Sequence, residues 1–149
     1  MQVDLVDYDR SFLDASFKWL ADEEIKFLTN TSSFSKDVQE QWFLSLSEKE
    51  DYYIRGILAD GIPIGACGLK HITNVDGEYW GYIGEKEYWG KGIGKQMMSF
   101  IESHARLLQL KQIYLLVIPE NIRAIRLYNN KGYRKIEEFN GMIKMCKQL

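Results

Sequence analysis

The chain has 149 residues, of which 46% are hydrophobic and 27% charged, and its formal net charge is −2. This is the composition of a globular protein with one hydrophobic core, so we expect residues 1–149 to form a single domain. The small net charge argues against a broad basic surface for nucleic acid, and the lack of a long apolar run argues against a membrane partner. Cys67 and Cys146 lie far apart and no signal peptide is evident, so we expect reduced thiols in a cytoplasmic protein.

The N-terminal part of the chain predicts one strand and two helices. Polar and apolar residues alternate over residues 2–6, which indicates a strand. Asp9 and Ser35 each precede an apolar stripe at helical spacing, and both are predicted N-caps. The stripes consist of Phe12, Leu13, Phe17 and Leu20 after the first cap and of Val38, Trp42 and Leu46 after the second. Residues 23–34, between the two helices, are predicted to form a loop.

Three consecutive strands are predicted in the middle of the chain. Residues 52–59 and residues 62–72 are rich in apolar, β-branched and aromatic side chains. The dipeptide Asp60-Gly61 between them suits a two-residue hairpin turn. Residues 73–77 indicate a second turn, and residues 78–84 form the third strand.

A strand, a glycine-rich turn and a helix follow one another next. Gly90, Gly92 and Gly94 stand at alternate positions directly before a helical pattern over residues 94–109. Glycine lets the backbone approach a ligand closely, and the unpaired N–H groups at a helix N-terminus favour an anion. Because the spacing fits neither the dinucleotide fingerprint nor the P-loop, we expect a phosphate-binding turn of another kind.

The C-terminal part predicts three strands and one short helix. Residues 112–118 form an apolar strand, and residues 122–131 form a helix. Residues 133–139 and 142–147 pair as a hairpin around Asn140-Gly141, which suits a type I′ turn. The resulting order of elements is β-α-α-β-β-β-α-β-α-β-β, which indicates a mixed sheet with helices on both faces.

Two segments resemble motifs of the GNAT acyl-CoA-dependent N-acetyltransferases. Residues 89–94 resemble the pyrophosphate-binding turn Gln/Arg-x-x-Gly-x-Gly/Ala, although Trp89 replaces the usual Gln or Arg. The form Tyr-Trp-Gly-Lys-Gly at residues 88–92 resembles the branch with ribosomal-protein N-terminal and nucleotide-amino-sugar acetyltransferases. Residues 121–133 resemble the second signature, Asn-x-x-Ala-x-x-x-Tyr-x-x-x-Gly-Phe/Tyr. The matching positions there are Asn121, Ala124, Tyr128 and Gly132.

This resemblance implies a fold and a reaction. GNAT domains have an α/β (α+β) architecture with a mixed, mostly antiparallel central sheet, helices on both faces, and the element order predicted above. The implied reaction moves an acetyl group from acetyl-CoA, the cosubstrate, to a primary amine. No metal is expected, because no His or Cys cluster has the spacing of a metal site.

The reaction needs a base and a partner for the departing thiolate. The amine must lose a proton, directly or through water, because a lysine-like amine has a pKa of about 10.4. The resemblance assigns this catalytic role to Glu78, with Glu85, His71 and water as alternatives. A solvated carboxylate at a strand end is the non-catalytic interpretation of Glu78. Tyr128 matches the general acid of the family, and a ring packed on the sheet is its alternative.

The resemblance also implies how acetyl-CoA binds. GNAT domains hold it in a gap between their fourth and fifth strands, here lined by residues 82–84 and 116–118, with backbone N–H groups as the donors. Lys91, Arg123 and Arg126 either approach CoA phosphates or are solvated surface residues. The predicted cofactor-binding residues are Tyr82, Ile83, Gly84, Trp89, Gly90, Lys91, Gly92, Ile93, Gly94, Lys95, Asn121 and Ala124.

The acceptor amine is defined least. Trp42, Tyr53, Tyr79 and Trp80 either stack on a sugar or nucleobase or belong to the core. We expect a small-molecule amine, with an amino sugar carried on a nucleotide as the first candidate. A protein N-terminus is the runner-up. A domain that binds acyl-CoA without catalysis is the third possibility.

The expected partners are therefore acetyl-CoA and an amine-bearing acceptor, with no nucleic acid and no membrane. The final hairpin is predicted to be exposed, and its pairing with a second copy would make a homodimer. Lys144 and Lys147 are predicted on its edge strand, where lysines oppose such pairing.

Overall fold

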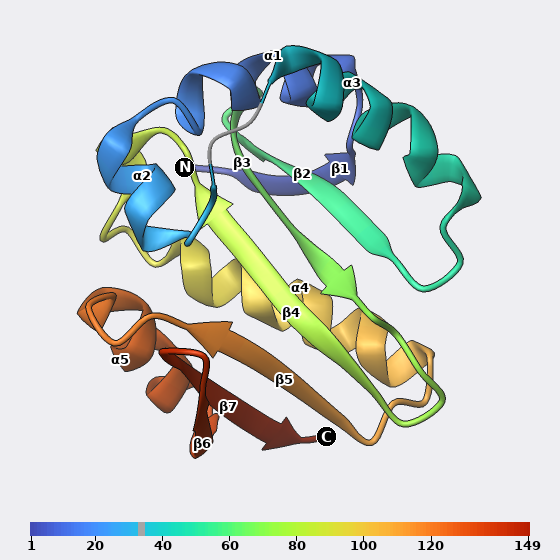
Figure 1. The fold of residues 1–149 in the computed structure, drawn as a ribbon, viewed down its shortest axis with the longest axis vertical. Coiled ribbons are helices and arrows are strands. Elements are labelled where there is room, and N and C mark those ends of the chain that lie inside the picture. The colour runs from blue at the N-terminus through green and yellow to red at the C-terminus, as the bar shows by residue number, and fades with distance from the viewer. Residues whose placement is uncertain (33–34) are drawn as a thin grey trace.

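The computed structural model describes residues 1–32 and 35–149 (Figure 1). In this described part, seven strands form one sheet in the order β1-β2-β3-β4-β5-β7-β6. The strands are β1 Val3–Asp7, β2 Tyr53–Ala59, β3 Ile62–Lys70, β4 Asp76–Ile83, β5 Gln112–Val117, β6 Arg134–Phe139 and β7 Met142–Gln148. The α-helices are α1 Arg10–Trp19, α2 Glu23–Leu28, α3 Lys36–Ser45, α4 Ile93–Leu107 and α5 Ile122–Asn130. Two 3₁₀ turns, η1 and η2, span Leu46–Glu48 and Lys86–Tyr88.

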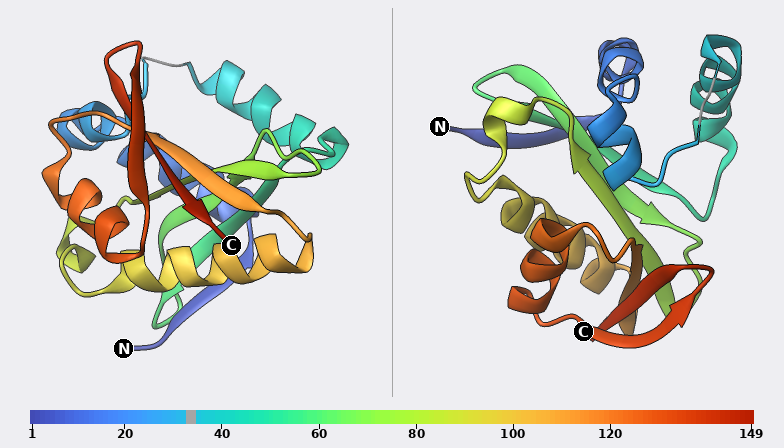
Figure 2. Two further views of the ribbon diagram at one scale, coloured as in Figure 1. Left: turned by 90° about the horizontal axis from the view of Figure 1, so that it is seen from below. Right: turned by 60° about the vertical axis from the view of Figure 1, so that its left-hand side comes forward.

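The sheet is mixed and mostly antiparallel, as predicted. Among the described strands β4 and β5 pair in parallel, and the other neighbours pair antiparallel. Helices α1 to α3 lie on one side of the sheet and α4 and α5 on the other (Figure 2). A parallel pair requires a crossover connection, and α4 provides it between β4 and β5. The predicted fold is confirmed.

Both predicted N-caps are confirmed. The Asp9 carboxylate accepts from the N–H of Ser11 at 3.0 Å, and Ser35 Oγ accepts from the N–H of Val38 at 3.1 Å. Helix α1 buries Phe12, Leu13, Ser16 and Trp19. Helix α3 buries none of its described residues, so its contacts with the rest of the protein are made by half-exposed side chains.

The predicted loop 23–34 is wrong in its first half, because α2 lies there. Asp22 caps this helix by accepting from the N–H groups of Glu24 and Ile25 at 3.0 and 3.1 Å. Acidic Glu23 and Glu24 in the first turn complement the helix dipole, and Ile25 is buried. The Asp22 cap and the burial of Ile25 stabilise α2, which is too short to show a hydrophobic periodicity in the sequence. Residues 33 and 34 of the predicted loop lie outside the described residues.

Turn positions were predicted better than strand ends. Both two-residue turns, at 60–61 and 140–141, have positive φ at each central residue, as a type I′ hairpin requires. The turn predicted at 73–77 is shorter than expected, because β4 already begins at Asp76. Backbone pairing with β5 extends β4 in this direction, and composition does not report such pairing.

The final hairpin corrects the prediction for the sheet edge. β7 pairs with β5 on one side and β6 on the other, so Lys144 and Lys147 belong to an interior strand. The edge strand is β6, all of whose residues are exposed. Its own charged residues, including Lys135 and Glu138, now occupy the position at which charge protects an edge.

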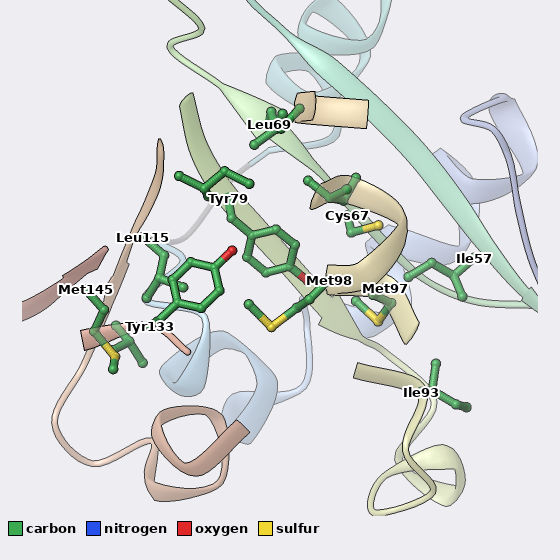
Figure 3. Close-up of a cluster of buried hydrophobic side chains, with 14 of the residues drawn as sticks. Ile57, Cys67, Leu69, Tyr79, Ile93, Met97, Met98, Leu115, Tyr133 and Met145 are labelled. Carbon is green, nitrogen blue, oxygen red and sulfur yellow. The ribbon is translucent and has the colours of Figure 1, made fainter. Parts of the chain in front are cut away.

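The hydrophobic core lies between the sheet and α4. Figure 3 shows Tyr79, Tyr133, Met97 and Met98 together in this cluster. Beside it, the Glu102 carboxylate is only 3% exposed. Its partners are Lys147 Nζ at 3.1 Å, Lys131 Nζ at 3.3 Å and the Tyr133 hydroxyl at 3.1 Å. These contacts fasten the end of α5 to α4 and β7.

Candidate functional site

A cleft opens where β4 and β5 separate. Their parallel pairing covers only Asp76–Glu78 against residues 112–114, after which the two strands diverge (Figure 1). The cleft has a volume of about 800 Å³ and is lined by the C-terminal halves of both strands, the glycine turn, α2, α3 and α5. A volume in this range suits a small-molecule site.

The backbone of β4 presents alternate residues to its two sides. The Gly84 N–H donates to Ile64 O on β3 at 2.6 Å, and in an antiparallel ladder this direction repeats at every second residue. The polar backbone groups of Tyr82 therefore also face β3, whereas those of Gly81 and Ile83 face the cleft. The sequence prediction did not include Gly81. The register of the β3–β4 ladder was the missing signal.

The glycine turn has the backbone conformation that requires glycine. Gly90 and Gly92 have φ of +72° and +80°, and no heavy atom lies within 4 Å of a Cβ placed on either. Gly94 serves packing instead, because its Cβ would come within 2.9 Å of Leu127 Cδ2 on α5. Ile93 is buried and anchors the turn in the core.

The N-terminus of α4 differs from those of the other described α-helices. Side chains of Asp9, Asp22, Ser35 and Asn121 cap those four helices, whereas the N-cap of α4 is Gly92, which has no side chain to offer. The first N–H groups of α4 thus lack both an intrahelical and a capping acceptor, and they carry partial positive charge. Such an end binds anions.

Trp89 closes the turn from the side. Its Nε1–H donates to Ile83 O at the end of β4 at 2.9 Å. The guanidinium of Arg123 lies 5.0 Å from the ring centre and Lys86 Nζ 5.8 Å, both within cation–π range. Trp89, the residue that departs from the family motif, therefore holds Arg123 of α5 beside the glycine turn by a cation–π contact.

Tyr128 lies under the opening between the strands. It projects from α5, and its ring lies 6.4 Å from that of Tyr79 and 6.3 Å from that of Tyr133. Burial raises the pKa of its phenol to about 12. The hydroxyl is therefore neutral at any physiological pH and can donate a hydrogen bond into the cleft.

Glu78 lies on the opposite face of β4 from the side chain of Tyr79. It is 7% exposed, and its Oε1 lies 3.1 Å from His71 Nδ1. Lys70 Nζ lies 3.6 Å from its Oε2. The imidazole of His71 is 63% exposed, so it links the buried carboxylate to solvent. The structure thus brings together two residues that the sequence offered as alternative bases.

Asn121 is occupied by contacts within the protein. Its Oδ1 caps α5 by accepting from the N–H of Ala124 at 3.2 Å. Its Nδ2 donates to Leu28 O, the last residue of α2, at 3.3 Å. The residue therefore connects α2 to α5 across the mouth of the cleft.

The four aromatic residues considered for the acceptor divide into two pairs. Tyr79 is 4% exposed and belongs to the core, although it also borders the cleft, and Tyr53 stacks on His104 with ring centres 3.5 Å apart. Trp42 and Trp80 line the cleft. Tyr8 and Tyr52 line it as well, and the sequence prediction did not include them because no local pattern separates them from core residues.

The predicted site residues largely gather at this one cleft. All of them line it except Gly84 and Lys91. Gly84 packs against Trp19. Glu85, an alternative base, lies outside the cleft, and its Oε1 is 3.9 Å from Lys18 Nζ.

No helix in residues 1–32 and 35–149 is both long and apolar enough to cross a membrane. Over the same residues, no three or more His, Cys, Asp or Glu side chains are grouped as they would be around a metal ion.

Comparisons with known proteins agree on the kind of protein. Residues 13–133 match the model of the Acetyltransferase (GNAT) family. A "Probable spermine N(1)-acetyltransferase" of Bacillus subtilis subsp. natto is 41% identical over 102 residues, which cover 65% of this chain and 67% of that protein. A "Spermine/spermidine N(1)-acetyltransferase" of Bacillus subtilis is 40% identical over the same shares.

A solved structure shares the fold over nearly the whole chain. The spermidine N-acetyltransferase of Vibrio cholerae, solved in complex with CoA and spermine, superposes with a TM-score of 0.88 at 22% identity. The superposition covers 99% of this chain and 95% of that one. The predicted order of strands therefore has a close counterpart among solved structures.

Proposed function

Because the chain belongs to the GNAT family and is an acyl-CoA-dependent N-acetyltransferase with acetyl-CoA as cosubstrate, we propose that its acceptor is a polyamine of the spermidine and spermine class. The observation that carries this proposal is a row of side chains on one face of β4. The buried carboxylate of Glu78 is followed at alternate positions by the rings of Trp80 and Tyr82, all lining the cleft. A carboxylate and aromatic rings suit a flexible cation with several amines.

The charges of the cleft argue against a nucleotide-linked amino sugar, the first candidate from the sequence. Its diphosphate would need a cation that is free to bind it. On the β3–β4 side of the described cleft, Lys70 is already paired with Glu78. The relatives named for spermine and spermidine acetylation support a polyamine instead. The amino sugar remains the alternative that an assay must include.

We further propose that acetyl-CoA lies along the glycine turn and the opening between β4 and β5. The pyrophosphate would accept from the uncapped N–H groups of α4, with Lys95 and Arg123 as nearby cations. The outward-facing backbone groups of Gly81 and Ile83 would hold the pantetheine arm. The Trp89 indole bonds the carbonyl oxygen of Ile83 and not its N–H, so this N–H can donate to the pantetheine arm.

In the proposed reaction the Glu78 carboxylate takes a proton from the ammonium of the acceptor, directly or through a water, and His71 passes it to solvent. The neutral nitrogen then attacks the thioester carbonyl carbon, so a C–N bond forms and a tetrahedral oxyanion appears. When the C–S bond breaks, the electron pair leaves with sulfur. The tetrahedral intermediate loses the second proton of the nitrogen to water, and the departing thiolate takes up a proton from water to give the free thiol of CoA.

Tyr128 acts mainly as a hydrogen-bond donor in this scheme. A free thiol has a pKa of about 8.5, whereas burial raises the pKa of Tyr128 to about 12. Complete proton transfer from the phenol to a relaxed thiolate would therefore be uphill. A hydrogen bond to the sulfur during C–S cleavage stabilises the developing charge without that transfer.

The test is release of free CoA thiol from acetyl-CoA with four acceptor classes: spermidine and spermine, amino sugars, nucleotide-linked amino sugars, and peptides with a free N-terminus. We expect turnover with the polyamines and a kcat/KM at least tenfold lower for the others. Faster turnover of a nucleotide-linked sugar would overturn the polyamine assignment. If no acceptor gives turnover, calorimetry with acetyl-CoA alone shows whether the protein binds the cosubstrate. Binding would mean that the true acceptor was not among those tested.

A further inference from the structure

Five aromatic side chains from separate segments form a wall on the acceptor side of the cleft. We call this group the aromatic wall; it consists of Tyr8, Trp42, Tyr52, Trp80 and Tyr82. Tyr8 and Trp42 meet edge to face with ring centres 5.8 Å apart, and the rings of Tyr52 and Trp80 lie 6.2 Å apart. The first contact joins the β1–α1 loop to α3, and the second joins the residue before β2 to β4.

The hydrophobic core accounts for only part of this wall, through ring contacts of Tyr8 with Phe12 at 5.6 Å and of Tyr82 with Trp19 at 6.0 Å. Each of its five members is only partly buried, and none belongs to the buried core. Helix α3 contributes Trp42 to the wall and buries no described residue of its own. Partly exposed rings that face a cleft instead of completing a core are characteristic of a ligand site.

Carboxylates cannot be the main partners of a second positive charge here. Glu24 and Glu78, the cleft-lining carboxylates from α2 and β4, already have cationic partners in Lys86 and Lys70. The third cleft-lining carboxylate, Glu120, comes from the β5–α5 loop, beside the proposed CoA phosphates. An ammonium on the acceptor side must therefore be held largely by rings and hydroxyl oxygens.

The wall is chemically suited to that task. Burial raises the pKa of the Tyr8 phenol to about 12, and those of Tyr52 and Tyr82 are raised further, so all three rings stay neutral. The indole N–H of Trp80 is buried without a described partner, near Gly68 of β3, which turns its donor edge away from the cleft. Neutral rings attract a cation through their π-faces.

On the basis of the proposed function, we propose that the aromatic wall binds the protonated nitrogen of the polyamine that is not being acetylated, by cation–π contact. Glu78, Trp80 and Tyr82 stand at two-residue intervals on β4, a spacing of about 6.8 Å for each step. That spacing resembles the distance between neighbouring nitrogens of a polyamine. One nitrogen can therefore lie at Glu78 while the next lies against the wall.

The test compares three substitutions at Trp42, which is partly exposed and outside the core: Trp42→Phe, Trp42→Leu and Trp42→Ala. We expect KM for spermidine to rise about threefold, tenfold and thirtyfold in that order, with kcat and the KM for acetyl-CoA unchanged. The matched control is Phe100→Leu, which removes an exposed ring of α4 outside the cleft. A linear monoamine of the same length should bind Trp42→Leu as well as it binds the wild type.

The outcomes separate this proposal from the proposed function. Equal KM values for spermidine in Trp42→Leu and the wild type would overturn the cation–π site and leave polyamine acetylation standing. Absence of spermidine turnover in the wild type would overturn the proposed function. Calorimetry with spermidine then tests the cation–π site. Spermidine binding that is weaker in Trp42→Leu than in the wild type supports the site, and absence of binding to the wild type overturns it.

Discussion

The two sides of the cleft differ in how they are built. The proposed cosubstrate side, comprising the glycine turn, the start of α4 and α5, would use backbone groups in fixed conformations. The proposed acceptor side, comprising the aromatic wall and Glu78, uses side chains from four separate segments. Backbone sites require particular residues at a fixed spacing, whereas side-chain sites can be assembled from many places. One side is therefore recognisable as a motif, and the other appears only in the folded protein.

The largest expected effect is a loss of acetyl-CoA binding through a change in the glycine turn alone. In Gly92→Val a β-branched residue must adopt φ near +80°, which distorts the turn and the start of α4. We expect the Kd for acetyl-CoA to rise at least a hundredfold by calorimetry. Gly61→Val is the matched control, because Gly61 also has φ of +80° with open space around it but lies in a hairpin outside the cleft.

Both variants should lose about 1–2 kcal/mol of stability from the strained backbone. Only Gly92→Val should lose acetyl-CoA binding. Equal loss of binding in both variants would mean that global destabilisation, and not the turn, was responsible.

The next effect lies where the two sides meet. Tyr128→Phe removes the hydroxyl that would stabilise the departing sulfur, and we expect kcat to fall a hundredfold or more while the Kd for acetyl-CoA changes less than threefold. Tyr133→Phe is the control, because its hydroxyl bonds Glu102 instead of facing the cleft. If Tyr128→Phe retains kcat, the Tyr128 hydroxyl does not stabilise the departing sulfur.

A smaller effect tests the acceptor side. Glu78→Gln removes the proposed base, and we expect kcat/KM for spermidine at pH 7.5 to fall about thirtyfold. The loss should shrink as the pH approaches 10, because the ammonium then loses its proton to solvent without help from Glu78. Glu85→Gln should leave the pH profile unchanged, since Glu85 faces Lys18. A loss that is constant across pH would contradict proton removal by Glu78.

The last effect concerns stability and involves a buried phenol on each side of the cleft and a buried thiol in the core. Burial raises the pKa of Tyr8, Tyr128 and Cys67 to about 12, above their unfolded values near 10, 10 and 9. Raised values mean that the folded state holds its protons longer, so this stability is complete below pH 9 and is lost as the pH rises toward 12. We expect urea unfolding midpoints to be flat from pH 7 to 9 and to fall by pH 11. A flat midpoint up to pH 11 would contradict this.

Particular residues show how far sequence reasoning reached. The glycine turn, the caps at Asp9 and Ser35 and the two hairpin turns were predictable, because each depends on residues within a few positions of one another. The pairing of Glu78 with His71 was not predictable, since it depends on the β4 register and the end of β3. The short helix α2 was missed because six residues show too little periodicity.

The sequence by itself determined the resemblance to the family, the succession of strands along the chain and the conformation of the turn, because each depends on residues within a short segment. Three features became known only from the tertiary structure. The backbone of Gly81 faces the cleft, Arg123 contacts Trp89 beside the glycine turn, and the aromatic wall lies in the same cleft as Glu78. These facts depend on strand register and on helix packing against the sheet. Such long-range relations leave no pattern in the neighbouring residues of the chain.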